Sequence, residues 1–230
     1  MTANQTVDAD DVQVASPLKT PGAAAVAGIV FSVLGIVSLL LIRLSTPASA
    51  GQAGAWLNDS TRRTTVAIGM NLVPFAGIAF LWFIGVIRDR VGRHEDRFFA
   101  TIFIGSGLLF VGMLFVATAI EGGIVSGISA KSFGSSASST LALGRDVTAA
   151  LVNTYAVRMA AVFTLTTVTI ARKTKIISRW LTYAGVPVAL VLLIGTGISL
   201  WVELLFPAWI LALSVDILLA RGREPITPTG

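Results

Sequence analysis

Long apolar runs separated by polar segments dominate the chain. Four runs cover residues 22–44, 66–87, 98–120 and 147–171, and a longer one covers residues 181–219. A helix needs about 20 apolar residues to cross the ~30 Å hydrocarbon core of a bilayer. Each of the first four runs meets that length, so each predicts one membrane-spanning helix.

The longest run is too long for a single span. One helix over residues 181–219 would be about 60 Å long at ~1.5 Å per residue, twice the hydrocarbon thickness. We therefore expect it to fold back near Trp201, Glu203 and Pro207, giving spans at 181–200 and 204–220, with a re-entrant segment as the alternative for the second. The pattern predicts an all-α integral membrane helical bundle of about six transmembrane helices, forming one domain over residues 22–220.

The distribution of basic residues predicts the orientation. With both termini in the cytoplasm, eleven Lys and Arg residues fall inside and five outside, as the positive-inside rule requires, although Arg62 and Arg63 oppose it. Residues 1–21 and 221–230 are then polar cytoplasmic tails, the first disordered. Ala48-Ser49-Ala50 resembles a signal cleavage site, but the preceding apolar run is too long and its flank too acidic, so we expect a retained helix.

Two polar segments between the runs differ in character. Residues 88–97 form a densely charged loop, and residues 121–147 are rich in Gly and Ser. For the second segment we expect disorder or loose packing, with a binding lid as the alternative.

Composition agrees with lipid as the main solvent. The chain is 54% hydrophobic and 13% charged, with a net charge of +5 and no cysteine. Its basic residues lie at the ends of apolar runs, which favours anionic lipid headgroups over nucleic acid as the acidic partner. Arg outnumbers Lys 13 to 4, which favours a bacterial source and its inner (plasma) membrane. We expect no cofactor.

Small residues recur at helical spacing along several spans. Gly28 lies between Ala24 and Ser32, Gly69, Gly77 and Gly85 recur every eight residues, and Gly105, Gly112, Gly185 and Gly195 mark two other spans. Small residues let helices approach closely in lipid. Packing within one chain is the simpler interpretation, and a dimer face is the alternative.

Arg158 is the candidate for an intramembrane polar site. It lies about eleven residues into its apolar run, and a charge at that depth is costly unless it faces protein or water. Its expected partners are Glu203, Glu121, Asn71 and Asn153. An anion site or gating ion pair and a purely structural pair remain open.

Two other groups are weaker candidates. Asp216 is interpreted as a proton carrier or, preferably, as a residue reaching the inner interface beside Arg221. His94 is the only histidine, and three adjacent residues, His94 to Asp96, rarely converge on one ion, so no metal site is expected.

Residues 85–94 carry a local resemblance. Gly85, Asp89, Arg90, Gly92 and Arg93 match the pattern G-x-x-x-D-R-x-G-R of major facilitator transporters, with His94 in place of the expected base. The resemblance implies a cytoplasmic loop in which an Asp–Arg contact latches helices during alternating access, but that family has two six-helix halves. Residues 70–97 also resemble uncharacterised actinobacterial multi-pass membrane proteins, which implies no activity.

The chain lacks the common catalytic motifs, including H-E-x-x-H, the phosphate-binding loop and the G-x-S-x-G elbow, so we expect no enzyme. Two hypotheses follow. The preferred one is an accessory or assembly protein that acts through helix contacts with the bilayer, a second copy or another membrane protein. The alternative is a small transporter or channel with a polar site around Arg158. A polar cavity at mid-membrane would favour the alternative.

Overall fold

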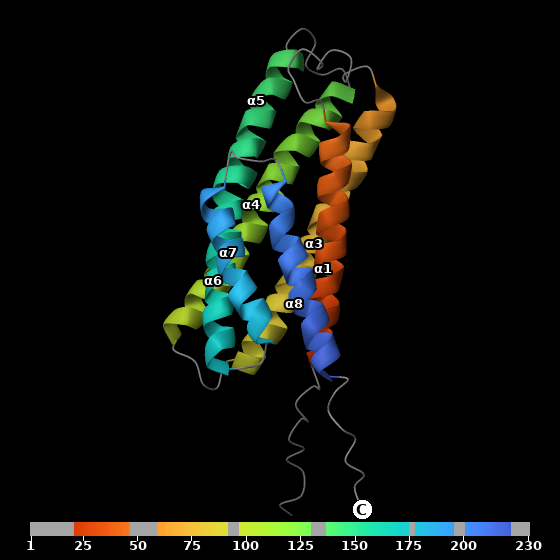
Figure 1. The fold of residues 1–230 in the computed structure, drawn as a ribbon. Coiled ribbons are helices and arrows are strands. Elements are labelled where there is room, and N and C mark those ends of the chain that lie inside the picture. The colour runs from red at the N-terminus through yellow and green to blue at the C-terminus, as the bar shows by residue number, and fades with distance from the viewer. Residues whose placement is uncertain are drawn as a thin grey trace, which may run out of the picture.

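The computed structural model describes residues 21–46, 59–91, 97–129, 137–174, 178–195 and 201–221, and these are almost entirely helical (Figure 1). The helices are α1 (Pro21–Ser45), α3 (Ser60–Val91), α4 (Arg97–Ser129), α5 (Ala137–Ala149), the π-helix η3 (Ala150–Ala156), α6 (Val157–Thr174), α7 (Arg179–Ile194), the short 3₁₀ turn η4 (Val202–Leu204) and α8 (Leu205–Arg221).

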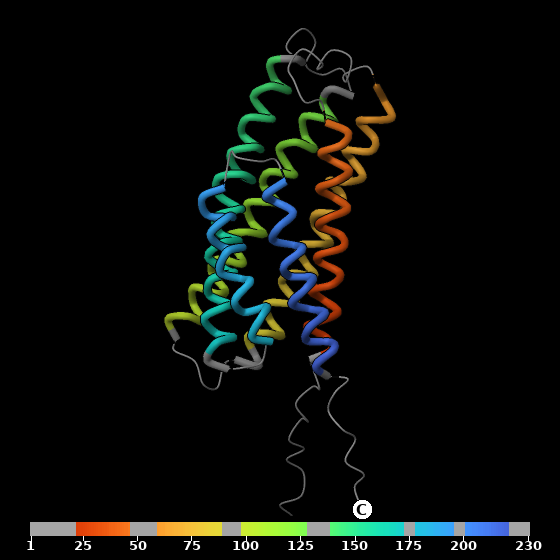
Figure 2. Tube along the Cα trace, in the orientation of Figure 1, coloured from red at the N-terminus to blue at the C-terminus, as the bar shows by residue number. Residues whose placement is uncertain are grey.

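Five of the described helical segments are long and apolar enough to span a membrane. They are Gly22–Ser45, Ser60–Arg88, Phe98–Gly127, Ser139–Arg172 and Val202–Ala220. The fourth combines α5, η3 and α6 into one rod, which Figure 2 traces without a break. The membrane helical bundle is thus supported, with five long helices where six spans were expected.

The sixth expected span, residues 181–200, is shorter than predicted. Helix α7 has 16 residues, or about 24 Å, less than the ~30 Å hydrocarbon core. It ends at Ile194, where the Gly195 N–H donates to Val191 O at 2.7 Å. The long apolar run does break, as its length required, but the break begins near Gly195, before the predicted turn at Trp201.

Other helices are longer than the apolar runs predicted. Helix α3 starts six residues earlier than the predicted span, where Asp59 Oδ1 accepts from the Arg62 N–H at 3.0 Å and caps the helix. Helix α4 continues to Ser129 and α5 begins at Ala137, so most of the expected Gly- and Ser-rich loop is helical. Pro21 of the predicted amino-terminal tail begins α1, and Arg221 of the predicted carboxyl-terminal tail ends α8. The rest of both tails, His94 and the serine-rich residues 132–136 lie outside the described residues.

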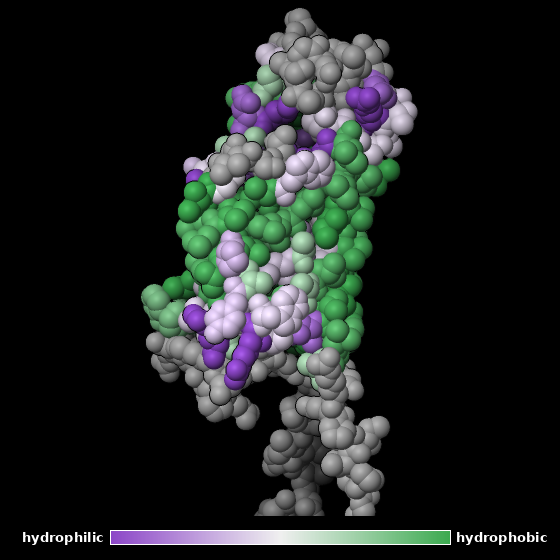
Figure 3. Space-filling model, viewed as in Figure 1, coloured by the Kyte–Doolittle hydropathy of each residue, from purple (hydrophilic) through white to green (hydrophobic). Residues whose placement is uncertain are grey.

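The helices lie side by side, and Pro21 and Arg221 lie at the same end of the bundle (Figure 1). We call this the terminal end and the opposite one the distal end. Helix α1 packs against α3 and α8, α4 against α3 and α6, and α7 against α6 and α8. On the face that Figure 3 shows, an apolar band covers the middle of the bundle and hydrophilic residues gather toward both ends, the pattern expected of a membrane-embedded surface.

Aromatic side chains fill the centre of the bundle. Phe80 is fully buried, and its ring centroid lies 4.5 Å from that of Phe31, 5.5 Å from Phe110, 5.1 Å from Phe163 and 5.6 Å from Phe206. Edge-to-face and tilted ring pairs at these distances add to the packing energy. The cluster joins α1, α3, α4, α6 and α8.

Small residues permit close approach at some of the predicted positions. A Cβ at Gly28 would collide with Ser214 and Phe83, and one at Gly185 with Val168. Ser38 Oγ of α1 donates to Gly69 O of α3 at 2.7 Å, a buried bond that needs the two backbones close together. Three of the predicted glycines, Gly85, Gly105 and Gly112, have nothing within 4 Å of a built Cβ, so these positions face outward rather than a neighbouring helix.

Candidate functional site

A cavity of about 390 Å³ lies between the helices in the distal part of the bundle. The distal ends of α1, α4 and α5 extend farther than the neighbouring ends of α7 and α8 (Figure 1). The wall is largely apolar, and the polar side chains on it are Ser38, Arg43, Thr46, Thr118, Glu121, Arg145, Thr148, Asn153 and Glu203. The volume falls within the range of small-molecule sites.

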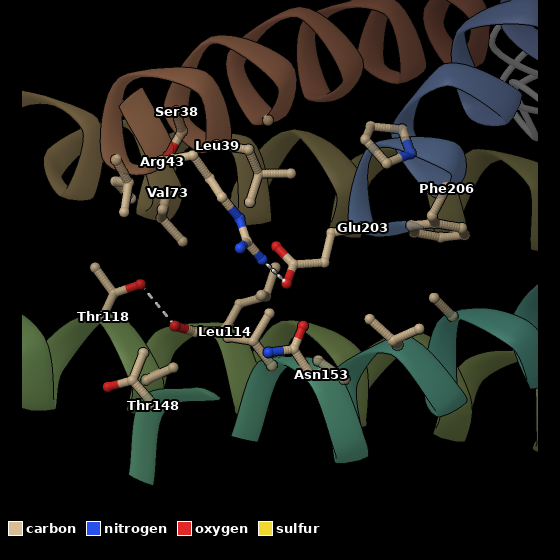
Figure 4. Close-up of a pocket in the computed structure, with 18 of the residues that line it drawn as sticks. Ser38, Leu39, Arg43, Val73, Leu114, Thr118, Thr148, Asn153, Glu203 and Phe206 are labelled. Atoms are coloured by element: carbon tan, nitrogen blue, oxygen red, sulfur yellow. Dashed lines mark hydrogen bonds and ion pairs between the residues drawn. The ribbon is translucent and has the colours of Figure 1, made fainter. Parts of the chain in front are cut away.

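An ion pair between Arg43 and Glu203 crosses the cavity. Arg43 Nη2 donates to Glu203 Oε1, and the two side chains are 23% and 8% exposed. Arg43 comes from the last turn of α1 and Glu203 from η4, before α8 (Figure 4). The break between α7 and α8 therefore carries Glu203 into the bundle, where a carboxylate needs a cationic partner.

Two further charged side chains, of opposite sign, line the cavity. Glu121 belongs to α4 and Arg145 to α5, and both line the cavity. Among the described residues, the cavity lining therefore holds two guanidinium groups and two carboxylates. Each comes from a different helical segment, and their formal charges sum to zero.

The π-helical segment η3 forms part of the wall. Its residues Val152, Asn153 and Ala156 line the cavity, and the N–H of Val157 donates to Val152 O, the i→i−5 bond of a π-helix. Figure 4 shows Asn153 reaching toward the Arg43–Glu203 pair from the opposite wall. π-helical turns are rare, and they occur frequently at functional sites. The presence of η3 in the wall is therefore a second, independent indication that this cavity is a functional site.

The hydroxyl groups on the wall differ in how they are bonded. Thr118 Oγ1 donates to Leu114 O at 2.7 Å, and Thr46 Oγ1 donates to Ile42 O at 2.6 Å, each to the carbonyl four residues earlier. The buried Oγ1 of Thr148 has no hydrogen-bond partner among the described residues. A buried hydroxyl is costly when unpaired, so Thr148 is suited to bond a molecule or water in the cavity.

The phenylalanine cluster closes the cavity toward the terminal end. Phe31, Phe110 and Phe206 line the cavity and also contact one another, with the Phe110 and Phe206 centroids 4.8 Å apart. Phe80 and Phe163 lie behind them in the core. The site thus has charged side chains toward the distal end and, toward the terminal end, the three phenylalanines, which we call the aromatic floor.

The predicted polar residues separate into three places. Asn153 and Glu203 both line the cavity, so the structure brings these two together. Arg158 is not among the lining residues; its Nη1 donates to Thr154 O of the same helix at 2.7 Å, while the expected partner Glu203 pairs with Arg43. Arg158 therefore lies beside the cavity lining, and its role at a polar site stays a prediction.

The other two predicted residues lie away from the cavity. Asn71 Nδ2 donates to Ala67 O at 2.8 Å and lines a separate groove between α3 and α4, beside Pro74. Asp216 Oδ2 accepts from the Ser178 N–H at 3.0 Å. Asp216 of α8 therefore bonds the backbone where α7 begins, a structural role at a helix amino terminus.

The loop resembling the facilitator motif is described only in part. Gly85, Asp89 and Arg90 belong to the last turns of α3, and Gly92 and Arg93 lie outside the described residues. Among the residues that the structure places, no group of three His, Asp or Glu side chains is arranged to hold a metal ion.

Arg43 and Arg145 are the charged cavity residues that the sequence pattern did not assign to the site, whereas Glu121, an expected partner of Arg158, does line the cavity. A signal for both arginines exists: each is a charged residue near the predicted outer end of an apolar run, as are Glu121 and Glu203. Four such residues of balanced charge at one end of a bundle indicate a shared polar site.

Comparisons of this chain with protein-family models, with curated proteins and with solved structures found no match.

Proposed function

We propose that the chain is a small membrane transporter that binds its substrate in the cavity between α1, α4, η3 and η4. The observation that carries the proposal is the placement of four ionisable side chains, from separate helices, on the wall of one cavity in an otherwise apolar bundle. Charges within a bilayer are costly, and where they are found they commonly mark a substrate or ion pathway.

The orientation follows from the basic residues. More basic residues of the described helices lie toward the terminal end (Arg88, Arg90, Arg97, Arg172, Lys173, Arg179 and Arg221) than toward the distal end (Arg43, Arg62, Arg63 and Arg145). The positive-inside rule then puts the terminal end in the cytoplasm and the cavity toward the outside of a plasma membrane. The aromatic floor is the barrier that must open for a substrate to reach the cytoplasm.

The competing function is an accessory protein that acts through helix contacts. In that case a partner's side chains occupy the cavity in the native membrane, and water enters only after purification. The two functions therefore differ in whether the cavity is reachable from water in cells.

The chain has no cysteine, so one introduced thiol is the only one in the protein. We expect Asn153→Cys to react with a membrane-impermeant maleimide in intact cells, because a thiol in a water-filled cavity can ionise and react. The matched control is Leu109→Cys, on the exposed apolar face of α4, which lipid should protect. Alternating access also predicts that Asn153→Cys reacts in inside-out vesicles.

Three other outcomes of this experiment would each contradict part of the proposal. Reaction from the distal side alone contradicts transport and indicates a fixed binding site. Reaction only after purification supports the accessory function. No reaction in purified protein that is folded contradicts a water-accessible cavity altogether.

A further inference from the structure

We infer that the cavity selects a zwitterion with an apolar body: a molecule that carries one cationic ammonium and one anionic carboxylate or phosphate group. The inference rests on the proposed function, since it requires a cavity that a small molecule can enter, and it names the class of substrate.

The first argument is charge balance. Arg43 and Arg145 offer guanidinium groups to an anion, and Glu121 and Glu203 offer carboxylates to a cation. The four sum to zero, so an ion of a single sign would leave an unbalanced charge in a low-dielectric site, whereas a zwitterion preserves neutrality.

The second argument is the geometry of the Arg43–Glu203 pair. Figure 4 shows the two side chains extended toward each other from different helices, with their charged ends inside the cavity. A zwitterion can replace each half of this pair, its anionic group binding Arg43 and its ammonium binding Glu203. A guanidinium binds carboxylate and phosphate through paired hydrogen bonds, which suits either anionic group.

The third argument is the apolar remainder of the lining. Phe31, Phe110 and Phe206 form the floor, and Leu114 and Leu192 lie on the wall. A ligand consisting of charged groups alone would leave these side chains facing water. An aliphatic or aromatic body attached to the zwitterionic head covers them and gains the free energy of apolar burial.

Two sources offer this chemistry: a free amino acid with an apolar side chain, and the headgroup region of a zwitterionic phospholipid. Both present an ammonium beside an acidic group and both carry apolar carbon. They differ in whether the ligand arrives from water or from the surrounding bilayer, which an experiment can separate.

The test uses the full chain carrying Asn153→Cys, in nanodiscs of phosphatidylglycerol, and measures the rate at which a neutral maleimide modifies the thiol. The probes are leucine, leucinamide and 4-methylpentanoate, which share one apolar body and are respectively zwitterionic, cationic and anionic. At about ten times its Kd a bound probe slows modification about elevenfold, because the free fraction falls as 1/(1 + [L]/Kd). We expect leucine to slow modification and the singly charged probes to have little effect.

A second arm replaces the lipid with phosphatidylethanolamine and omits leucine. Slow modification in that arm, without an effect of leucine, identifies the lipid as the zwitterion. An effect of leucine in phosphatidylglycerol identifies a water-borne one. Either result supports the inference.

Variants that change the charge of the cavity should change which probe protects the thiol. A purely structural role of these residues would not produce that change. Adding Glu203→Gln leaves the positive charge of Arg43 unbalanced, so the anionic 4-methylpentanoate should now protect the thiol better than leucine does. Adding Arg43→Gln leaves the negative charge of Glu203 unbalanced, so the cationic leucinamide should protect it better. Where either variant fails to fold, Glu121→Gln and Arg145→Gln make the same change of charge at the other two ionisable residues of the cavity. The inference is overturned if leucinamide or 4-methylpentanoate protects the parent as well as leucine does, or if neither leucine nor phosphatidylethanolamine protects. A thiol that never reacts contradicts the proposed function instead.

Discussion

Replacing Arg43 with glutamine removes the cationic half of the ion pair and leaves the Glu203 carboxylate, 8% exposed, without its guanidinium partner. Breaking a buried pair in this way costs roughly 3–5 kcal/mol. Since Arg43 is itself 23% exposed and the pair borders a cavity, we expect the lower end of that range, about 3 kcal/mol. Glu203→Gln should cost less, because the more exposed Arg43 can reach cavity water.

The double variant should recover most of the loss. Two glutamines leave no uncompensated charge, and replacing both members of a buried pair is often close to neutral. We therefore expect the double variant to be more stable than Arg43→Gln alone. The matched control is Arg62→Gln, whose pair with Asp59 is exposed and should contribute less than about 1 kcal/mol.

Thermal unfolding in detergent measures these differences. The five tryptophans provide the fluorescence signal, and Trp201 lies two residues from Glu203. For a chain of this size about 1 kcal/mol corresponds to roughly 2–4 °C, so Arg43→Gln should lower the Tm by about 6–12 °C. An unchanged Tm for Arg43→Gln, or a double variant whose loss equals the sum of the two single losses, would refute the coupling of Arg43 to Glu203.

Three further substitutions test the packing and the placement of the site. Gly28→Ala should destabilise by about 1–3 kcal/mol, because its Cβ meets Ser214 and Phe83, while Gly112→Ala, with open space around it, should have little effect on the Tm. Phe80→Ala should cost about 3–5 kcal/mol by opening a hole at the centre of the aromatic cluster, whereas Phe98→Ala, at a 62% exposed side chain, should cost far less in the same unfolding assay. Arg158→Leu should leave the maleimide reactivity at position 153 and its protection by leucine unchanged, and a changed protection pattern would return Arg158 to the site.

The helical architecture follows from the apolar runs, because their length leaves few other structures in lipid. The helix ends were less predictable. Asp59 extends α3 by capping it with a local hydrogen bond, and residues 137–146 are helical although their Gly and Ser content predicted a loop. Both helix boundaries depend on hydrogen bonds and packing contacts, which a hydropathy pattern does not predict.

The site was predicted in part. Glu203 and Asn153 were expected at a polar site, and both line the cavity. Arg158 was expected at its centre because depth in an apolar run identifies a buried charge, but depth does not say which way a side chain points on its helix. Arg43 completes the pair with Glu203 because α1 and α8 lie side by side, a neighbour relation between helices distant in the sequence. The π-helical turn at η3 has no pattern in its residues that predicts it.

The central claim, that water fills a charged cavity inside the bundle, is tested most directly by deuterium modulation of a nitroxide's electron spin echo in D₂O. Single spin labels are attached through Asn153→Cys and Leu109→Cys, both within long spanning helices, in the full chain in nanodiscs. We expect deep deuterium modulation from the label at position 153 and shallow modulation from the label at position 109. Equally shallow modulation at both positions would show a dry interior and contradict the account.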